Sequence, residues 1–120
     1  MADRSKVLIV EDSLLISMDE QAMVEACGCA VVGPVASVEE ALALIGTERL
    51  SAAVLDVNLG EDCVWPVAAA LDERGVPFVL ATGYADPEIP ARYRSRPLLA
   101  KPLGVAALKG RLEEIGAIGA

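Results

Sequence analysis

Five reactive side chains each stand at the end, or just past the end, of a short apolar run. In chain order they are Glu11, Asp12, Asp56, Thr82 and Lys101. Two carboxylates about 4 Å apart repel each other by roughly 4 kcal/mol at an effective dielectric constant of about 20, and a third adds to that cost. If the three acids meet, they require positive charge, of which Lys101 supplies one unit. A hard divalent ion that prefers carboxylate, carbonyl and water oxygens, such as Mg²⁺, would supply the rest.

Asp56 is the best placed of these acids to act as a nucleophile. It follows the apolar run 52–55 and precedes Val57, so we expect its backbone to be held rigidly. A carboxylate beside a metal ion, with a hydroxyl and an amine within reach, can attack phosphorus and form an aspartyl phosphate. Thr82 and Lys101 would then bind the phosphoryl oxygens. The loop 58–60 could turn a backbone carbonyl toward the metal ion.

The elements that must position these side chains alternate along the chain. Nearly continuous apolar runs are typical of strands that are covered on both faces. They span residues 7–10, 30–35, 52–55, 78–81 and 98–100. Helical periodicity is clearest at Val38, Ala41, Leu42 and Ile45 and again at Val105, Leu108, Leu112 and Ile115. Ser37 with Glu40 predicts a capping box before the helix that begins near Val38, and Pro66 suits the first turn of the next helix.

The fourth connection is interrupted by Pro87 and Pro90. We expect a short or irregular helix between Asp86 and Arg94, because proline removes a helical hydrogen bond. The nearby basic residues are Arg92, Arg94 and Arg96. Solvated charge is their default interpretation, and a docking face is the alternative. Trp65 is interpreted as a packing anchor for the third helix rather than as a ligand platform.

The order strand–helix, repeated five times, predicts an α/β fold. We expect a doubly wound, flavodoxin-like (βα)5 domain with a five-stranded parallel sheet in the order 2-1-3-4-5. Ligands of such sheets bind beyond the carboxyl ends of the strands. The five reactive side chains are therefore expected to converge there.

Length and composition narrow the possible functions. The 120 residues are expected to form one domain, residues 1–120. A net charge of −8 argues against binding to nucleic acid, which requires clustered basic residues. The sequence has no run of eighteen apolar residues and no signal peptide, so we expect a cytoplasmic protein that does not bind membranes. With no histidine, Cys27, Cys29 and Cys63 are interpreted as small apolar residues of a reducing cytosol rather than as a zinc site.

The acidic pair, the later Asp and Thr, and the final Lys-Pro resemble, in order and strand context, the receiver domains of two-component response regulators. The resemblance covers essentially the whole chain. It implies that Asp56 is the phospho-acceptor, with Thr82 as the switch hydroxyl and Lys101 as the amine that pairs with phosphate. It also implies a Mg²⁺ site and a cis peptide bond between Lys101 and Pro102. The implied metal ligands are the side chains of Asp12 and Asp56, Glu11 through water, and the main-chain carbonyl of Asn58.

The sequence departs from most receivers in the placement of its aromatic residues. Leu98 stands three residues before Lys101, where receivers usually have Tyr or Phe. The segment 79–84 instead resembles a receiver subgroup whose fourth strand ends in Phe-Ala-Thr-Gly-aromatic, with Leu80 in place of the Phe. Leu103 also stands where Phe is common. We hypothesise that Tyr84 and its loop, up to about Arg94, form the phosphorylation switch; the alternative is an ordinary half-buried tyrosine at the edge of the core.

Three functions are compatible with these observations. The preferred one is a stand-alone response regulator that takes a phosphoryl group from a sensor histidine kinase or phosphotransfer protein and signals to an unidentified downstream protein through a changed surface. Such a domain would catalyse only its own phosphorylation and dephosphorylation. The second is a phosphatase of the haloacid dehalogenase type, but its Asp-x-Asp pattern is missing because Asn58 stands two residues after Asp56. The third is a receiver-like interaction protein that never turns over phosphate.

Overall fold

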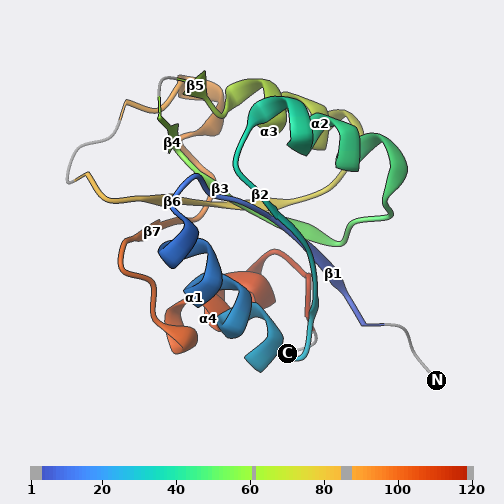
Figure 1. The fold of residues 1–120 in the computed structure, drawn as a ribbon, viewed down its shortest axis with the longest axis vertical. Coiled ribbons are helices and arrows are strands. Elements are labelled where there is room, and N and C mark those ends of the chain that lie inside the picture. Colours follow the sequence, from blue (N-terminus) through green and yellow to red (C-terminus); the bar gives the residue numbers. More distant parts are fainter. Residues whose placement is uncertain (1–3, 61, 85–87, 119–120) are drawn as a thin grey trace.

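The computed structural model describes residues 4–60, 62–84 and 88–118 (Figure 1). Its main sheet has five strands in the order β2-β1-β3-β6-β7, and every neighbouring pair is parallel. These strands are β1 (Lys6–Val10), β2 (Ala30–Val35), β3 (Ala52–Asp56), β6 (Phe78–Thr82) and β7 (Leu98–Ala100). The remaining two, β4 (Asn58–Leu59) and β5 (Asp62–Cys63), form a small antiparallel hairpin. Without the hairpin the order is the expected 2-1-3-4-5, and the predicted fold class is confirmed.

Helices cover both faces of the sheet. They are α1 (Leu14–Ala26), α2 (Val38–Thr47), α3 (Trp65–Glu73) and α4 (Val105–Glu114). Figure 1 shows α2 and α3 on one face and α1 and α4 on the other. Side chains alternate along a strand, so successive residues of β1 enter different hydrophobic cores. Leu8 and Val10 pack in the core beneath α2 and α3, whereas Val7 and Ile9 pack in the core beneath α1 and α4. Within the described part of the chain, no helix is long and apolar enough to cross a lipid bilayer.

The predicted helix starts are confirmed. The hydroxyl of Ser37 accepts the backbone N–H of Glu40 at 3.1 Å and donates to the Glu40 carboxylate at 3.0 Å. Pro66 lies in the first turn of α3, where a missing N–H leaves no intrahelical bond unmade. Local sequence signals are therefore sufficient to begin α2 and α3 at these positions.

The fourth connection contains a short, irregular helix between Asp86 and Arg94, as expected. The only helical residues described there are a 3-10 turn, Ala91–Tyr93, while residues 85–87 lie outside the described part. The Tyr93 ring is buried and stacks on Trp65, with centroids 5.3 Å apart and planes inclined by 8°. Trp65 is thus a packing residue, as predicted, but the residue that it anchors is Tyr93.

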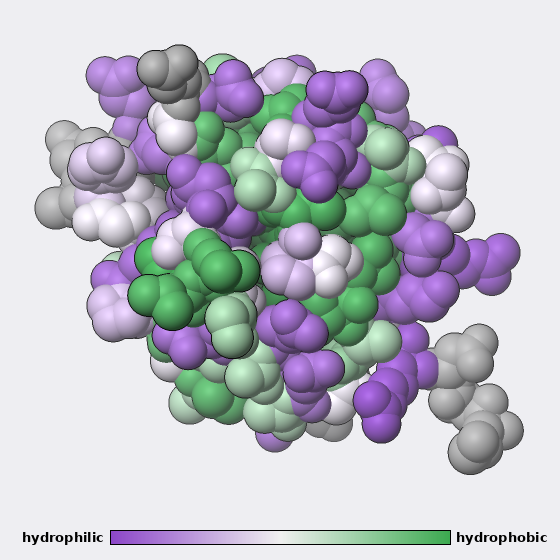
Figure 2. All heavy atoms as spheres, in the orientation of Figure 1, coloured by the Kyte–Doolittle hydropathy of each residue, from purple (hydrophilic) through white to green (hydrophobic). Residues whose placement is uncertain are grey.

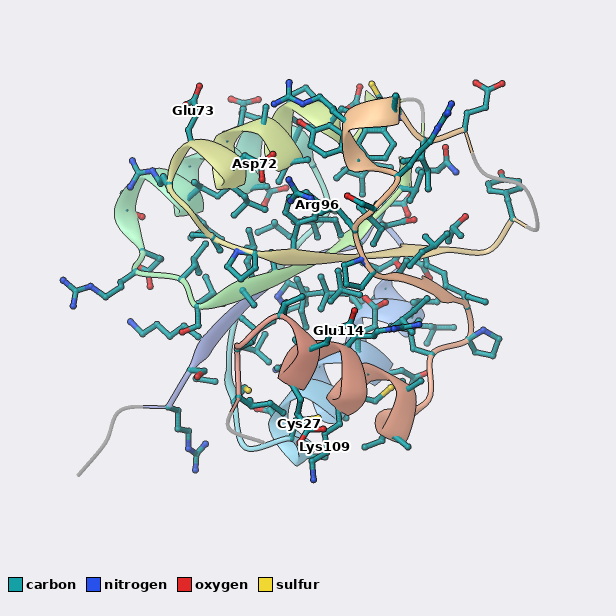
Figure 3. All side chains as sticks on the ribbon, turned by 180° about the vertical axis from the view of Figure 1, so that it is seen from behind. Cys27, Asp72, Glu73, Arg96, Lys109 and Glu114 are labelled. Atoms are coloured by element: carbon teal, nitrogen blue, oxygen red, sulfur yellow. The ribbon has the colours of Figure 1, made fainter. Side chains whose placement is uncertain are left out.

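Arg96 is not the solvated residue that the sequence suggested. Its guanidinium makes two contacts with the Asp72 carboxylate of α3, at 2.9 and 3.0 Å (Figure 3). The same group lies 4.6 Å from the centroid of the Phe78 ring. Ion pairing and stacking together tie the residues before β7 to α3 and to the start of β6, so Arg96 is a structural residue.

The pairing of β1 with β2 contains an irregularity that the sequence did not predict. The register shifts between Leu8 and Val10, opposite Gly33. Gly33 has a φ of +90°, and a Cβ there would lie 2.9 Å from the backbone nitrogen of Val35. Only glycine fits such a backbone. Beyond the shift, the Glu11 N–H donates to the Val35 carbonyl at 2.9 Å, which fixes the residue that follows β1.

Candidate functional site

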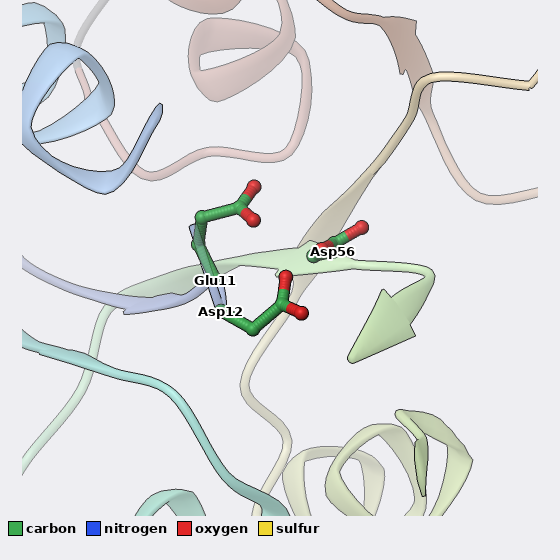
Figure 4. Close-up of side chains that lie close together, drawn as sticks. All are labelled: Glu11, Asp12 and Asp56. Carbon is green, nitrogen blue, oxygen red and sulfur yellow. The ribbon is translucent and has the colours of Figure 1, made fainter. Parts of the chain in front are cut away.

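Three carboxylates meet at the carboxyl ends of β1 and β3. Figure 4 shows Glu11, Asp12 and Asp56 with their carboxylates close together, and one oxygen of each lies within 4.8 Å of the others. The cause is the parallel pairing of the two strands, which sets Val10 opposite Leu55. Residues that directly follow this pair must emerge at the same edge of the sheet. The structure therefore brings together the acids that the sequence singled out.

Lys101 reaches this cluster from the end of β7, which is an edge strand of the sheet. Its Nζ lies 2.5 Å from Oε1 of Glu11 and 3.2 Å from Oδ1 of Asp56. The Lys101 backbone N–H donates to the Thr82 carbonyl at 2.8 Å, which anchors the residue after β7. Glu11 is fixed in turn, because its other carboxylate oxygen accepts the N–H of Ser13 at 3.1 Å. The Lys101–Pro102 peptide bond is cis.

The charges at the site do not balance. Burial raises the pKa of Asp56 to about 7, the neighbouring Glu11 acts in the same direction, and Lys101 opposes both. Burial by itself would lower the pKa of Lys101, but its contacts with Glu11 and Asp56 outweigh that effect and raise it. A second cation would favour the ionised form of Asp56. Because hard divalent ions prefer carboxylate oxygens, the cluster could hold such an ion.

Thr82 and Asn58 flank Asp56 on either side. Thr82 ends β6 and is buried, and its position follows from the pairing of Asp56 with Ala81. Its Oγ1 accepts the backbone N–H of Tyr84 at 3.1 Å. The Asn58 N–H donates to Oδ1 of Asp56 at 3.2 Å. Asn58 belongs to the β4–β5 hairpin, which gives the expected loop a more regular backbone than the sequence indicated.

Tyr84 lies at the rim of the site. The cluster opens into a hollow of about 380 Å³, which Tyr84 lines together with Asp56, Asn58 and Lys101. The residue is 65 % exposed. The alternative interpretation, a half-buried tyrosine that caps the core, is therefore wrong for this structure.

One residue beside the site was missed by the sequence analysis. Glu20 of α1 is only 1 % exposed. Burial raises its pKa to about 8, and the negative charge of Glu11 adds to the increase. A helical signal was available, because Ser17, Glu20 and Val24 follow one another at the spacing of a single buried helix face. The acid on that face was overlooked because its type is usually exposed.

Solved structures identify the class of protein to which this fold and site belong. No protein-family model and no curated protein sequence matches the chain. The chain is 40 % identical to SdrG from Sphingomonas melonis Fr1, with a TM-score of 0.85 over 96 % of this chain and 98 % of that one. The BeF3-activated conformation of SdrG from Pseudomonas melonis Fr1 is 39 % identical, with a TM-score of 0.80 over 98 % of this chain and 100 % of that one. A response regulator receiver domain from Methylobacillus flagellatus is 25 % identical, with a TM-score of 0.81 over 94 % and 99 % of the two chains.

These similarities extend over almost the full length of each chain, and the fold and the acidic cluster agree with them. The chain belongs to the receiver domains of response regulators.

Proposed function

We propose that residues 1–120 act as one receiver domain, which accepts a phosphoryl group on Asp56 in a Mg²⁺-dependent reaction and signals through a changed protein-binding surface. One observation carries the proposal. The buried Asp56 ends β3 beside two further acids and within 3.2 Å of the Lys101 ammonium. The existence of a BeF3-activated form of the similar protein SdrG supports a phosphoryl group as the activating signal.

The phosphoryl donor would be a phosphohistidine on a sensor histidine kinase or phosphotransfer protein. A carboxylate oxygen of Asp56 forms a bond to phosphorus as the bond from phosphorus to the imidazole nitrogen breaks, and that nitrogen keeps the electron pair. The Lys101 ammonium, which already contacts Glu11 and Asp56, donates to a phosphoryl oxygen. The Thr82 hydroxyl, on the neighbouring strand, donates to another.

The Mg²⁺ ligands would be the side chains of Asp12 and Asp56, Glu11 through water, and the main-chain carbonyl of Asn58. When bound, the ion supplies a Lewis acid that offsets the charge on the transferred group. Asp12 is the exposed member of the acidic cluster, so it faces the hollow from which an ion would enter.

The signal would leave the site through the loop after β6. Thr82 Oγ1 is tied to the Tyr84 N–H. A hydroxyl that turns toward a phosphoryl group must change this bond, and the exposed Tyr84 would move with its backbone. We propose Tyr84 and its loop, up to about Arg94, as the element whose two states phosphorylation shifts. Its partner is a downstream protein.

Incubation with acetyl phosphate and Mg²⁺ tests the proposal. A receiver gives one stable phosphoryl adduct per chain, and omission of Mg²⁺ prevents it. Multiple turnover of phosphomonoesters would indicate a phosphatase, and the absence of any adduct would indicate an interaction module. Either of these two results would overturn the proposal.

A further inference from the structure

A basic pocket lies at the amino ends of the strands, on the edge of the sheet opposite Asp56. It has a volume of about 480 Å³ and is lined by Arg4, Ser5, Lys6, Ala30, Arg49 and Ser51. Three of the ten basic residues of a chain with a net charge of −8 therefore surround one pocket. In Figure 2, hydrophilic side chains gather along the right-hand edge, where the amino end of β1 and the connection from α2 to β3 lie in the same view (Figure 1).

Parallel pairing brings the walls of this pocket together from distant parts of the chain. Val7 of β1 lies opposite Ala52 of β3, so the residues that precede them emerge at the same edge of the sheet. Lys6 and Ser51 are also joined directly. The Lys6 N–H donates to the Ser51 hydroxyl oxygen at 3.3 Å, and the Ser51 N–H donates to the Lys6 carbonyl at 2.8 Å. The backbone of the pocket is thus fixed by the sheet.

The described acids leave most of the positive charge of the pocket unpaired. None of the described residues that line it is acidic. The Lys6 ammonium lies 3.8 Å from the Glu48 carboxylate, and because both side chains are partly exposed, this ion pair is weak. Neither Arg4 nor Arg49 forms an ion pair with another described residue. Like charges around one space repel each other, and a bound anion would remove that repulsion.

The side chains that carry the charge favour phosphate groups. A guanidinium presents a planar set of donors that matches two oxygens of one phosphate. The pocket has two such groups, Arg4 and Arg49, and so suits two phosphates. The Ser51 hydroxyl accepts the Lys6 N–H and keeps its own hydrogen for a ligand. Ser5 does not, because its hydroxyl donates to the Ala117 carbonyl at 2.6 Å.

The walls and the overall charge narrow the kind of molecule. No aromatic ring is among the described residues that line the pocket, so there is no surface on which a nucleobase would stack. The net charge of −8 repels large polyanions such as nucleic acids and anionic membranes. A small anion that enters the pocket meets chiefly the local positive charge. These observations favour a compact, soluble ligand.

We propose that the pocket at the amino ends of β1 and β3 binds a soluble anion with two linked phosphate groups. Arg4 and Arg49 hold the phosphates, and Lys6 and Ser51 add a charge and a hydroxyl donor. This anion site is separate from Asp56 and goes beyond the proposed function. The ligand is bound without reaction.

Titration of the metal-free full chain with inorganic pyrophosphate at low ionic strength, followed by ¹H–¹⁵N NMR, tests the site. Orthophosphate is the matched probe with a single phosphate. Pyrophosphate should shift the amide signals of Ser5, Lys6 and Ser51. It should bind at least about tenfold more tightly than orthophosphate, because the second phosphate adds charge-assisted hydrogen bonds. Equal affinity for the two anions, or no shift at these three residues, would overturn the proposal.

Three variants with the same change of charge locate the site. Arg4→Gln and Arg49→Gln should each weaken pyrophosphate binding by at least about fivefold, because each removes one charged partner. Arg74→Gln, at an exposed position that does not line the pocket, should weaken it by less than about twofold, since solvent and salt screen distant charges. Arg4 and Arg49 are exposed too, so all three variants should fold, and thermal unfolding checks this. An equal loss in all three would indicate general attraction of anions and contradict a site.

Two further measurements separate this inference from its alternatives. Cardiolipin vesicles carry two phosphates in each headgroup, and the protein should not sediment with them. Sedimentation that Arg49→Gln abolishes would identify a lipid headgroup as the ligand and contradict a soluble one. Arg49→Gln should be labelled by acetyl phosphate and Mg²⁺ as the parent is, because the pocket lies at the other edge of the sheet. Lost labelling would contradict a separate site, whereas failure of pyrophosphate to bind leaves the assignment of Asp56 intact.

Discussion

The backbone N–H of Tyr84 is hydrogen-bonded to the hydroxyl of Thr82, at 3.1 Å. The hydroxyl of a buried strand end is thereby joined to the backbone of an exposed loop. In most receivers an aromatic ring on the last strand responds to this hydroxyl, but here that position is Leu98. A signal carried by Thr82 would thus pass through the backbone of Tyr84.

Tyr84→Ala should separate phosphorylation from signalling. The variant should accept phosphate at the rate of the parent but lose its phosphorylation-dependent binding to a downstream protein, because the ring is absent from the moving loop. Leu98→Ala is the control. A fully buried leucine costs about 2–5 kcal/mol when it is replaced by alanine, but Leu98 is 37 % exposed, so we expect a smaller loss of stability and an intact response.

Phosphotransfer assays combined with partner-binding measurements, with and without BeF3, distinguish these outcomes. If Tyr84→Ala keeps the full change in partner affinity, the loop of Tyr84 is not the switch. A lost response in Leu98→Ala at unchanged stability would instead place the switch on β7.

Asp12→Ala should weaken Mg²⁺ binding by at least about tenfold, because it removes one charged ligand from a hard cation. The metal-free fold should not suffer, since Asp12 is exposed and its removal relieves repulsion within the cluster. Isothermal titration calorimetry measures the affinity, and thermal unfolding with a chelator present measures the stability. Unchanged Mg²⁺ affinity would show that the ion binds elsewhere, and a lower metal-free melting temperature would contradict the repulsion argument.

The metal-free protein should lose stability as the pH rises from about 5.5 to 8.5. The folded pKa of Asp56 is about 7, well above the value near 3.9 of an unfolded aspartate. Between these values the folded state holds a proton that the unfolded state has released, so each rise in pH favours unfolding. Asp56 alone should account for on the order of 2 kcal/mol, and Glu20, with its pKa of about 8, acts with the same sign.

Urea unfolding in the presence of a chelator measures this dependence. Asp56→Asn should reduce the difference between the two pH values, and Mg²⁺ should reduce it in the parent. A metal-free protein that is more stable at pH 8.5 than at pH 5.5 would refute the raised pKa of Asp56 in the folded state.

Arg96→Lys should destabilise the fold by about 1–2 kcal/mol, although the charge is kept. Lysine cannot reproduce the double contact with Asp72 or the stacking on Phe78. Arg74→Lys, at an exposed position, should change the free energy of unfolding by less than about 0.5 kcal/mol. Chemical denaturation measures both free energies of unfolding. If Arg96→Lys and Arg74→Lys change this free energy equally, Arg96 does not have the structural role described above.

The alternation of strands and helices and the acidic cluster were predictable because they depend on local patterns, whereas the strand order was expected only from the likeness to flavodoxin-like folds. Continuous apolar runs place Asp56 and Lys101 at strand ends, and parallel pairing brings such ends to one edge of the sheet. The packing of the fourth connection was not predictable in the same way. The 3-10 turn Ala91–Tyr93 ends in a ring that stacks on Trp65, a contact between residues far apart in the sequence.

The same limit applies to single charged side chains. An arginine among other basic residues is usually solvated. Arg96 is a structural residue only because Asp72 and Phe78 lie beside it in the fold. Glu20 is a similar case, since its type predicts exposure while its place on the buried face of α1 removes it from water. For Arg96 the deciding neighbours lie far away in the chain, whereas for Glu20 the spacing of the buried residues of α1 carried part of the signal.

Mapping the phosphorylated residue tests the central claim most directly. After incubation with acetyl phosphate and Mg²⁺, mass spectrometry of the intact chain and of its peptides should find one phosphoryl group, located on Asp56. Asp56→Asn, which keeps the shape but removes the nucleophilic oxygen, should fold as the parent does and remain unlabelled. A phosphoryl group on another residue of the parent, or undiminished labelling of Asp56→Asn, would contradict the account.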